Sequence, residues 1–337
     1  MIQWTEDTLN SLLGCFMCSP GCYHCYAIDD LWRMGHNPKL GIDDSPYAGL
    51  VEKHPVTGKR NWTGRIRFLP HKLYAVLRQK RSRMYFVNSL SDLFYERLPQ
   101  EIILEHFRIF GMAYWHQFQV LTKRSERLVQ LSPQIPWPEN VWMGVSVERA
   151  ESIYRIADLG KTDAHLKFIS FEPWLSGARR LREQHPDLRS VLQAAGIDWA
   201  IIGGESSKRK DQARFMDLDD VRYLIEECRG AGVKIFLKQL GTRWAVDSNT
   251  YGAKGSDGKR AEEVNAGGNP AFWPAEFRDP QLREHPAVSN KPWAQPHGIY
   301  PSAMPTDWKK WATPEMETPG NPKHANLVRI ADLSPAA

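Results

Sequence analysis

The segment Gly14-Cys15-Phe16-Met17-Cys18-Ser19-Pro20-Gly21-Cys22-Tyr23-His24-Cys25-Tyr26-Ala27 holds four of the five cysteines of this 337-residue chain. The fifth, Cys228, stands alone far downstream. Dense thiols near the start of a chain that is otherwise poor in cysteine predict a metal site rather than a disulfide framework. Three thiolates can hold a 4Fe–4S cluster and leave one iron open to bind a substrate or cofactor.

Two sets of three cysteines have spacings that suit such a cluster. Cys18-x3-Cys22-x2-Cys25 resembles the commonest motif of radical S-adenosylmethionine (SAM) enzymes, and Cys15-x6-Cys22-x2-Cys25 is the second possibility. A four-cysteine zinc site usually places about 15–20 residues between its two pairs. Here only three residues separate them, which favours iron–sulfur over zinc, and a redox dithiol is the remaining alternative.

Composition indicates an ordinary soluble globular protein, with 42% hydrophobic and 25% charged residues. No stretch approaches the 18 apolar residues of a membrane span, and residues 1–10 lack a signal-peptide pattern. We therefore expect no membrane association and a reducing cytoplasm, which also suits an oxygen-sensitive cluster. The net charge of +5 permits an anionic partner such as nucleic acid without requiring one.

Strands and helices alternate regularly after residue 64. Strands are predicted at 65–68, 83–87, 118–121, 141–145, 166–169, 199–202 and 233–237, and a short strand at 2–5 leads into the cysteines. Helices are predicted at 71–80, 100–113, 126–131, 152–159 and 218–229. A helix begins at residue 29, and an irregular insertion covers about residues 30–62.

This pattern predicts an α/β fold in which residues 1–241 form a TIM-type (βα) barrel, partial or complete. Nearly every predicted strand ends in a charged or amide residue, whereas an open doubly wound sheet, the alternative, would gather ligand residues at one switch point. Residues 242–337 are predicted to be an irregular extension that wraps the barrel. Twelve of the 23 prolines lie between Pro270 and Pro335, together with tryptophans that can pin the segment: Trp244, Trp273, Trp293, Trp308 and Trp311.

Seven short motifs in consistent order resemble one family of proteins. They are the cysteine segment 14–27, Phe-Val-Asn-Ser-x-Ser-Asp-Leu-Phe (86–94), Leu-Thr-Lys-Arg (121–124), Gly-Val-Ser-Val-Glu (144–148), Ser-x-Glu-Pro (170–173), Gly-Gly-Glu-Ser (203–206) and Lys-Gln-x-Gly (238–241). The chain resembles the phage-associated three-cysteine-motif radical SAM proteins over about residues 2–280. In that family the first ligand corresponds to Cys15, and position 18 is usually not cysteine. We therefore expect Cys15, Cys22 and Cys25 to bind the cluster, with Cys18 as the alternative third ligand.

The resemblance implies that SAM bound to a 4Fe–4S cluster is cleaved to a 5′-deoxyadenosyl radical, which abstracts a substrate hydrogen. Residues at the predicted strand ends are candidates to bind SAM or the substrate: Tyr26, Asn88, Ser91, Asp92, Lys123, Ser146, Glu148, Glu172, Gly203, Gly204, Glu205 and Lys238. Asp92 and Glu205 are the strongest candidates. For any one charged residue the alternative is a structural ion pair at the barrel mouth, and His24 and Cys228 are expected to be structural.

The same resemblance suggests a substrate, because similar phage proteins include isomerases of DNA thymidine hypermodification. The leading hypothesis is rearrangement of a glycyl-modified thymidine in phage DNA, in the host cytoplasm if the gene belongs to a phage. An electron donor of the flavodoxin or ferredoxin type is then required. Basic residues at 208–210 and 78–83 are candidate DNA contacts. A protein or peptide substrate and a zinc-stabilised nucleic-acid-binding module are the alternatives.

Overall fold

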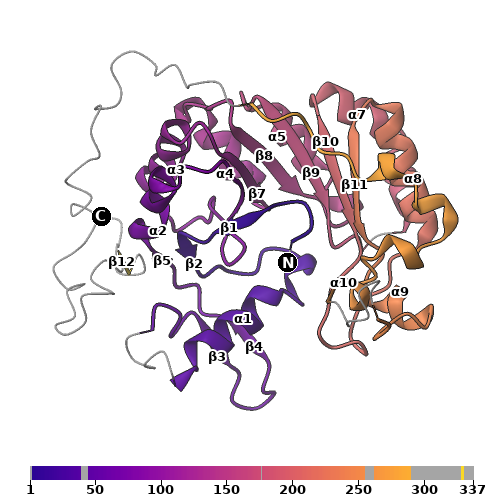
Figure 1. The fold of residues 1–337 in the computed structure, drawn as a ribbon, viewed down its shortest axis with the longest axis horizontal. Coiled ribbons are helices and arrows are strands. Elements are labelled where there is room, and N and C mark those ends of the chain that lie inside the picture. Colours follow the sequence, from indigo (N-terminus) through magenta and orange to yellow (C-terminus); the bar gives the residue numbers. More distant parts are fainter. Residues whose placement is uncertain (1, 39–44, 176, 255–261, 290–327, 330–337) are drawn as a thin grey trace.

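A computed structural model describes residues 2–38, 45–175, 177–254, 262–289 and 328–329. Its main sheet contains seven parallel strands and curls into a half-barrel (Figure 1). In spatial order the strands are β1 (Asp7–Leu9), β6 (Met84–Val87), β7 (Gln117–Thr122), β8 (Val141–Ser146), β9 (Leu166–Phe171), β10 (Trp199–Gly203) and β11 (Lys234–Gln239). Spatial order follows chain order without reversal, so the sheet has no switch point of the doubly wound kind.

The helices between β6 and β11 connect the strands and pack on the convex face of the sheet, whereas the first helix and the last two lie away from this face (Figure 1). The helices are α1 (Tyr26–Gly35), α2 (Pro70–Ala75), α3 (Gln100–Met112), α4 (Ser125–Leu131), α5 (Tyr154–Gly160), α6 (Ala178–Gln184), α7 (Leu188–Ala194), α8 (Leu218–Gly230), α9 (Thr242–Asp247) and α10 (Glu262–Asn265). The burial of strand β8 shows that the sheet is covered on both faces. All six of its residues are buried, which is the pattern of a central parallel strand.

An aromatic layer fills the concave face toward the N-terminal ends of the strands. One aromatic side chain from each of five strands forms it together with Trp4: Phe86, Trp142, Phe168, Trp199 and Phe236. Centroids of the Trp142 and Trp199 rings lie 5.7 Å apart in an edge-to-face arrangement. The layer fills the concave face at this end, so a ligand of the concave face would lie toward the carboxyl ends of the strands.

Residues 283–289 cross the N-terminal ends of the strands and complete the aromatic layer. The indole N–H of Trp199 donates to the carbonyl of Glu284 at 2.8 Å, and the His285 ring packs 5.4 Å from Trp199. Farther along, the hydroxyl of Ser289 donates to Glu139 at 3.1 Å. Before this segment, Trp244 and Trp273 are buried in the core. Three other tryptophans predicted to pin the extension, Trp293, Trp308 and Trp311, lie outside the described residues.

Two small antiparallel sheets lie outside the main one. Strands β2 (Leu12–Leu13) and β12 (Val328–Arg329) flank β5 (Arg67–Phe68), and β3 (Val51–Lys53) pairs with β4 (Arg60–Trp62). The insertion predicted for residues 30–62 therefore contains a hairpin packed against α1.

Three predictions about the elements were wrong. Residues 2–5 are not a strand, because β1 begins at Asp7 and Trp4 instead joins the aromatic layer. The strand expected at 65–68 is not a barrel strand but belongs to the antiparallel sheet. Helices α6 and α7 lie between β9 and β10, where no helix was predicted.

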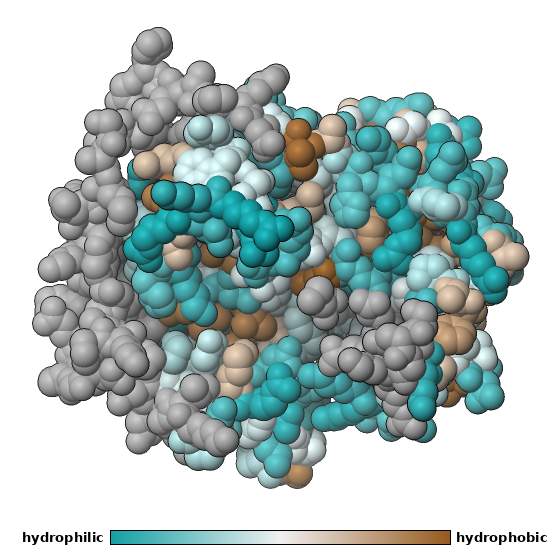
Figure 2. Space-filling model, in the orientation of Figure 1, coloured by the Kyte–Doolittle hydropathy of each residue, from teal (hydrophilic) through white to brown (hydrophobic). Residues whose placement is uncertain are grey.

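No helix in the described part of the chain is long and apolar enough to cross a membrane. On the face shown in Figure 2 the described residues are mostly hydrophilic, and apolar side chains appear in small separate patches.

The variant Gly144→Ala tests the packing of the aromatic layer. A methyl group at this position would lie 2.4 Å from the fully buried Phe168 ring, so Gly144→Ala should lower the free energy of unfolding by about 1–3 kcal/mol. Urea unfolding measures the change. Phe168→Leu removes the ring that the methyl group meets, so the double variant should lose less stability than the sum of the two single variants. Strict additivity would contradict this packing.

Candidate functional site

The four cysteines lie on one loop, residues 14–25, between β2 and α1 at the carboxyl edge of the sheet. We call it the cysteine loop. Its first residue is fixed beside the end of β6, since the N–H of Gly14 donates to the carbonyl of Leu90 at 3.1 Å. Gly14 has a φ of +94°, and a Cβ there would lie 2.1 Å from the carbonyl oxygen of Arg65. Only glycine fits at this point.

Arg124, which follows β7, holds the middle of the cysteine loop. Its Nη2 donates to the carbonyl of Phe16 at 2.9 Å, and its Nη1 donates to Oδ2 of Asp92 at 2.9 Å. Asp92 also accepts the Thr122 hydroxyl at 2.7 Å. Burial raises the pKa of Asp92, but the Arg124 charge and the hydrogen bonds outweigh it, so the pKa lies below the ordinary 3.8. Asp92 is thus a buried anchor for Arg124.

Arg214 holds the second half of the cysteine loop in the same way. Its Nη1 donates to the carbonyl of Pro20 at 2.9 Å, and its guanidinium pairs with Glu205, which follows β10. His24 of the loop lies 3.0 Å from the same carboxylate. Burial raises the pKa of Glu205, but the hydrogen bonds from Arg214 and His24 lower it by more, so the net shift is downward. Both strongest candidates from the sequence therefore join ion pairs that position the loop.

Of the four thiols, Cys15, Cys22 and Cys25 are partly buried and Cys18 is exposed. Burial raises the pKa of Cys15 to about 12 and that of Cys25 to about 11. A hydrogen bond from the Cys18 thiol, together with the charge of Lys123, holds the pKa of Cys22 well below its ordinary value. Charges on Cys22 and Cys25 act on Cys15, so these three thiols are close neighbours.

The thiols are not arranged at metal-coordination distances in this structure. Among the described residues, no group of three or more His, Cys, Asp or Glu side chains is spaced to hold a metal ion. The cysteine loop brings the candidate ligands to one place without setting them at coordination distance.

Three buried polar atoms near the cysteine loop have no hydrogen-bond partner in the described structure: Nδ2 of Asn88, Oγ of Ser91 and Oε1 of Glu148. Asn88 is oriented by Leu12, whose N–H donates to its Oδ1 at 3.3 Å. Glu148 lies against the loop, because a Cβ on Gly21 would be 3.2 Å from its Cγ. Unsatisfied buried groups are costly in a protein, so these atoms fit a polar ligand between the strand ends and the loop.

The candidates at the ends of β9 to β11 mostly contact one another. Lys238 forms an ion pair with Glu172, which also accepts from Gln239 at 3.4 Å. A Cβ on Gly204 would lie 2.6 Å from the carbonyl oxygen of Leu240, so close approach of two loops requires this glycine. Gly203 lies beside Glu172.

Two further candidates, Ser146 and Tyr26, come from β8 and α1. Ser146 is buried at the end of β8, where its carbonyl accepts from Arg155 at 2.7 Å. Tyr26, directly after Cys25, begins α1 and is 47% exposed.

The two basic segments do not form one surface. Residues 208–210 follow β10 at the carboxyl edge, and residues 78–83 precede β6 at the opposite edge of the sheet. Lys208 pairs with Asp30 at 2.9 Å, and Lys210 lies over the Tyr251 ring. Only the first segment is near the cysteine loop.

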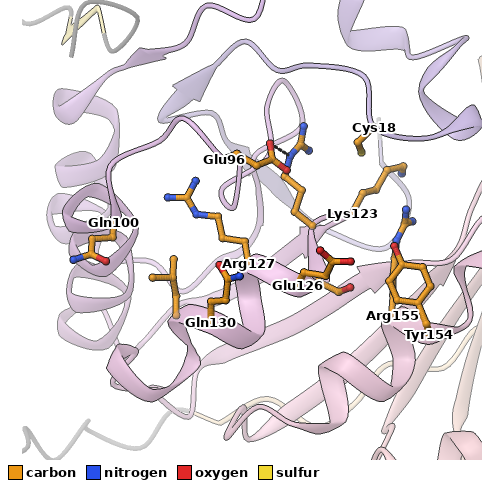
Figure 3. Close-up of a pocket in the computed structure, with 12 residues that line it drawn as sticks. Cys18, Glu96, Gln100, Lys123, Glu126, Arg127, Gln130, Tyr154 and Arg155 are labelled. Carbon is orange, nitrogen blue, oxygen red and sulfur yellow. Dashed lines mark hydrogen bonds and ion pairs between the residues drawn. The ribbon is translucent and has the colours of Figure 1, made fainter. Parts of the chain in front are cut away.

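Sequence reasoning missed Arg214, Arg155 and Tyr154. Arg155 donates to Oε2 of Glu148 at 2.7 Å, and Arg155 and Tyr154 line a pocket of about 540 Å³ beside Cys18 (Figure 3). No motif marks these residues, and Arg214 lies in a loop outside any predicted element.

One family model matches residues 1–270 of the chain, and its description is "Protein of unknown function (DUF5131)". The chain belongs to the DUF5131 family. No curated protein and no solved structure matches it. The matched part of this DUF5131 protein contains the cysteine loop, all seven strands of the main sheet and both arginines that hold the loop. Because the family description carries no activity, function must be argued from the site.

The variant Asp92→Asn tests the first of the two loop anchors. It leaves the buried Arg124 charge without its one buried carboxylate in the described structure, with only the exposed Glu96 as a carboxylate partner, so the free energy of unfolding at neutral pH should fall by about 3 kcal/mol. The wild-type protein should also lose this contribution as the pH falls below about 4, because the folded-state pKa of Asp92 is depressed. Urea unfolding at several pH values measures both effects, and the acid loss should be smaller in the variant.

Glu183→Gln is the matched control, since it breaks the exposed Arg179–Glu183 pair and should change stability by at most about 0.5 kcal/mol. Equal effects of the two changes would contradict a buried anchor.

Proposed function

We propose that this protein is a radical SAM enzyme whose 4Fe–4S cluster is held by Cys15, Cys22 and Cys25. The observation that carries the proposal is the placement of the cysteine loop, fixed by the buried Arg124 and the partly buried Arg214 over the open carboxyl edge of a parallel half-barrel. Chemistry in such folds lies at this edge. When bound, the cluster and SAM supply a 5′-deoxyadenosyl radical that removes hydrogen from a substrate.

The exposure of the thiols favours Cys15 over Cys18 as the third ligand. Cys15 is partly buried beside Cys22 and Cys25, whereas Cys18 faces the solvent-exposed pocket. Ligands must be thiolates, and Lys123 and Arg124 supply positive charge that offsets the cost of ionising buried thiols. These two cations thus prepare the loop for an anionic set of ligands.

The unpartnered atoms near the cysteine loop suit the polar parts of SAM. Nδ2 of Asn88 is a donor for its carboxylate, and Oε1 of Glu148 is an acceptor for its amino group or ribose hydroxyls. The aromatic layer excludes water from the opposite end of the concave face. Asp92 and Glu205 act indirectly, by positioning the loop.

For the substrate we favour a modified nucleobase of DNA, with isomerisation of a glycyl-thymidine as the reaction. Four aromatic rings in or near the cysteine loop are about half exposed and offer faces on which bases can stack: Phe16, Tyr23, Tyr26 and Phe215. Lys59 lies 5.5 Å from the centre of the Tyr23 ring. The cluster requires an electron donor of the flavodoxin or ferredoxin type.

Anaerobic reconstitution of cysteine variants tests the cluster. Cys15→Ala, Cys22→Ala and Cys25→Ala should each lose the brown colour, the bound iron and the release of 5′-deoxyadenosine. Cys18→Ala should keep all three, as should the control Cys228→Ala, whose thiol is buried in α8. Loss with Cys18→Ala but not with Cys15→Ala would make Cys18 the third ligand. A wild-type protein that binds zinc and no iron would contradict the proposed radical SAM function.

Binding of single-stranded DNA tests the substrate class. Affinity should fall more than about tenfold between about 50 and 200 mM salt, because phosphate contacts release counterions. Phe215→Ala should weaken binding by about tenfold through loss of stacking, and the control Val288→Ala, also about half exposed, should not. Mass spectrometry of nucleosides from treated DNA then identifies the product. Binding that does not change with salt would exclude DNA as the substrate.

A further inference from the structure

The pocket beside Cys18 lies outside the concave face, between the cysteine loop and the first turns of α3, α4 and α5 (Figure 3). Its volume of about 540 Å³ falls within the range of small-molecule sites. Polar and charged side chains line most of it. This pocket takes no part in holding the cysteine loop except through Arg124.

Two of the four cations that line the pocket have no carboxylate partner in the described structure. The Lys123 ammonium makes no hydrogen bond or ion pair there, although the main-chain N–H of Lys123 donates to Asp92 at 3.1 Å and, against the effect of burial, the ammonium charge lowers the pKa of Glu148. Arg127 donates to the main-chain carbonyls of Tyr95 and Leu98. Arg124 and Arg155, by contrast, are paired with buried carboxylates.

Among the residues that the structure describes, neither acidic residue of the pocket forms an ion pair with Lys123 or Arg127. Glu96 pairs with Arg124, and Glu126 is exposed to solvent, where its charge is well screened. The Lys123 ammonium is therefore the pocket cation that remains available to an anionic ligand.

One end of the pocket combines positive charge with an aromatic face. Figure 3 shows Lys123, Tyr154 and Arg155 together at the end near Cys18. The Tyr154 ring is 49% exposed, and Arg155 lies 5.8 Å from its centre. Arg155 itself is 5% exposed and has a buried Nε–H without an acceptor.

A ring that can stack on a base, next to donors that can bind phosphate, is the combination that nucleotides require. Gln100 and Gln130 line the rest of the pocket and add neutral hydrogen-bonding groups.

We infer that this pocket binds a phosphorylated nucleoside, with its phosphate at Lys123 and its base against Tyr154. The phosphate ester can come from a free nucleotide or from a nucleotide within a strand. That this pocket is the substrate-binding site rests on the proposed radical SAM function, whereas nucleotide binding by the pocket does not.

Equilibrium dialysis with thymidine 5′-monophosphate tests the inference on the full chain, with and without cluster. A pyrimidine is used because an adenine could enter the SAM site. The wild-type protein should bind the monophosphate at least about tenfold more tightly than thymidine. Inorganic phosphate and a short thymidine oligonucleotide are the other arms, and tighter binding of the oligonucleotide would identify a strand as the source.

Lys123→Gln should weaken binding of the monophosphate by about tenfold, and Lys123→Arg should restore most of it. Lys234→Gln, at an exposed position on the opposite edge of the sheet, is the matched control and should have no effect. Tyr154→Leu should weaken binding of the monophosphate but not of inorganic phosphate, whereas Tyr154→Phe should behave as the wild type.

Equal binding by the wild type and Lys123→Gln, or equal binding of thymidine and its monophosphate, would overturn the inference. Bound iron and 5′-deoxyadenosine release, measured on the same samples, report the proposed function separately. If Lys123→Gln lost SAM cleavage but bound the monophosphate as tightly as the wild type, the inference about the pocket would fail. The proposed radical SAM function would not be contradicted.

Discussion

The site depends on two ion pairs, one buried and one partly buried, that extend to main-chain carbonyls. In each, a carboxylate placed by a strand end holds an arginine, and the arginine donates to a carbonyl of the cysteine loop. Arg124 and Arg214 contact the loop four residues apart, at Phe16 and Pro20, on either side of Cys18. A buried ion pair adds little net stability, but it specifies geometry because any other arrangement leaves a charge unpaired. The loop is thereby fixed relative to the sheet before any ligand binds.

The two ends of the half-barrel thus differ in polarity. Aromatic rings fill the N-terminal end so tightly that Gly144 must lack a side chain beneath Phe168. Charged and amide side chains fill the carboxyl end, where three polar atoms stay unpartnered in the described structure. A rigid apolar base supports a polar edge that can exchange its hydrogen bonds with a ligand, which is the arrangement that barrel enzymes use.

Most of the sheet could be predicted from the sequence because its central strands are apolar runs bounded by polar ends. Six of the seven strands lie within a few residues of their predicted positions. β1 was misplaced because Ile2-Gln3-Trp4-Thr5 has stronger β-propensity than Asp7-Thr8-Leu9, and tertiary packing overrides such propensity.

The roles of the site residues were less predictable. Strand-end position marks Asp92, Glu172 and Glu205 as important, but it does not reveal that their partners Arg124, Lys238 and Arg214 come 32, 66 and 9 residues later. Whether a carboxylate faces a ligand or an arginine is decided by tertiary contacts.

Residues 283–289 also bear on the order in which the chain can acquire its structure. The Trp199 indole finds its acceptor on Glu284, 85 residues later and beyond the part that the family shares. While the polypeptide emerges from the ribosome, all seven strands are synthesised before this acceptor exists. The aromatic end of the nascent half-barrel therefore lacks this cover until residues 283–289 have been translated.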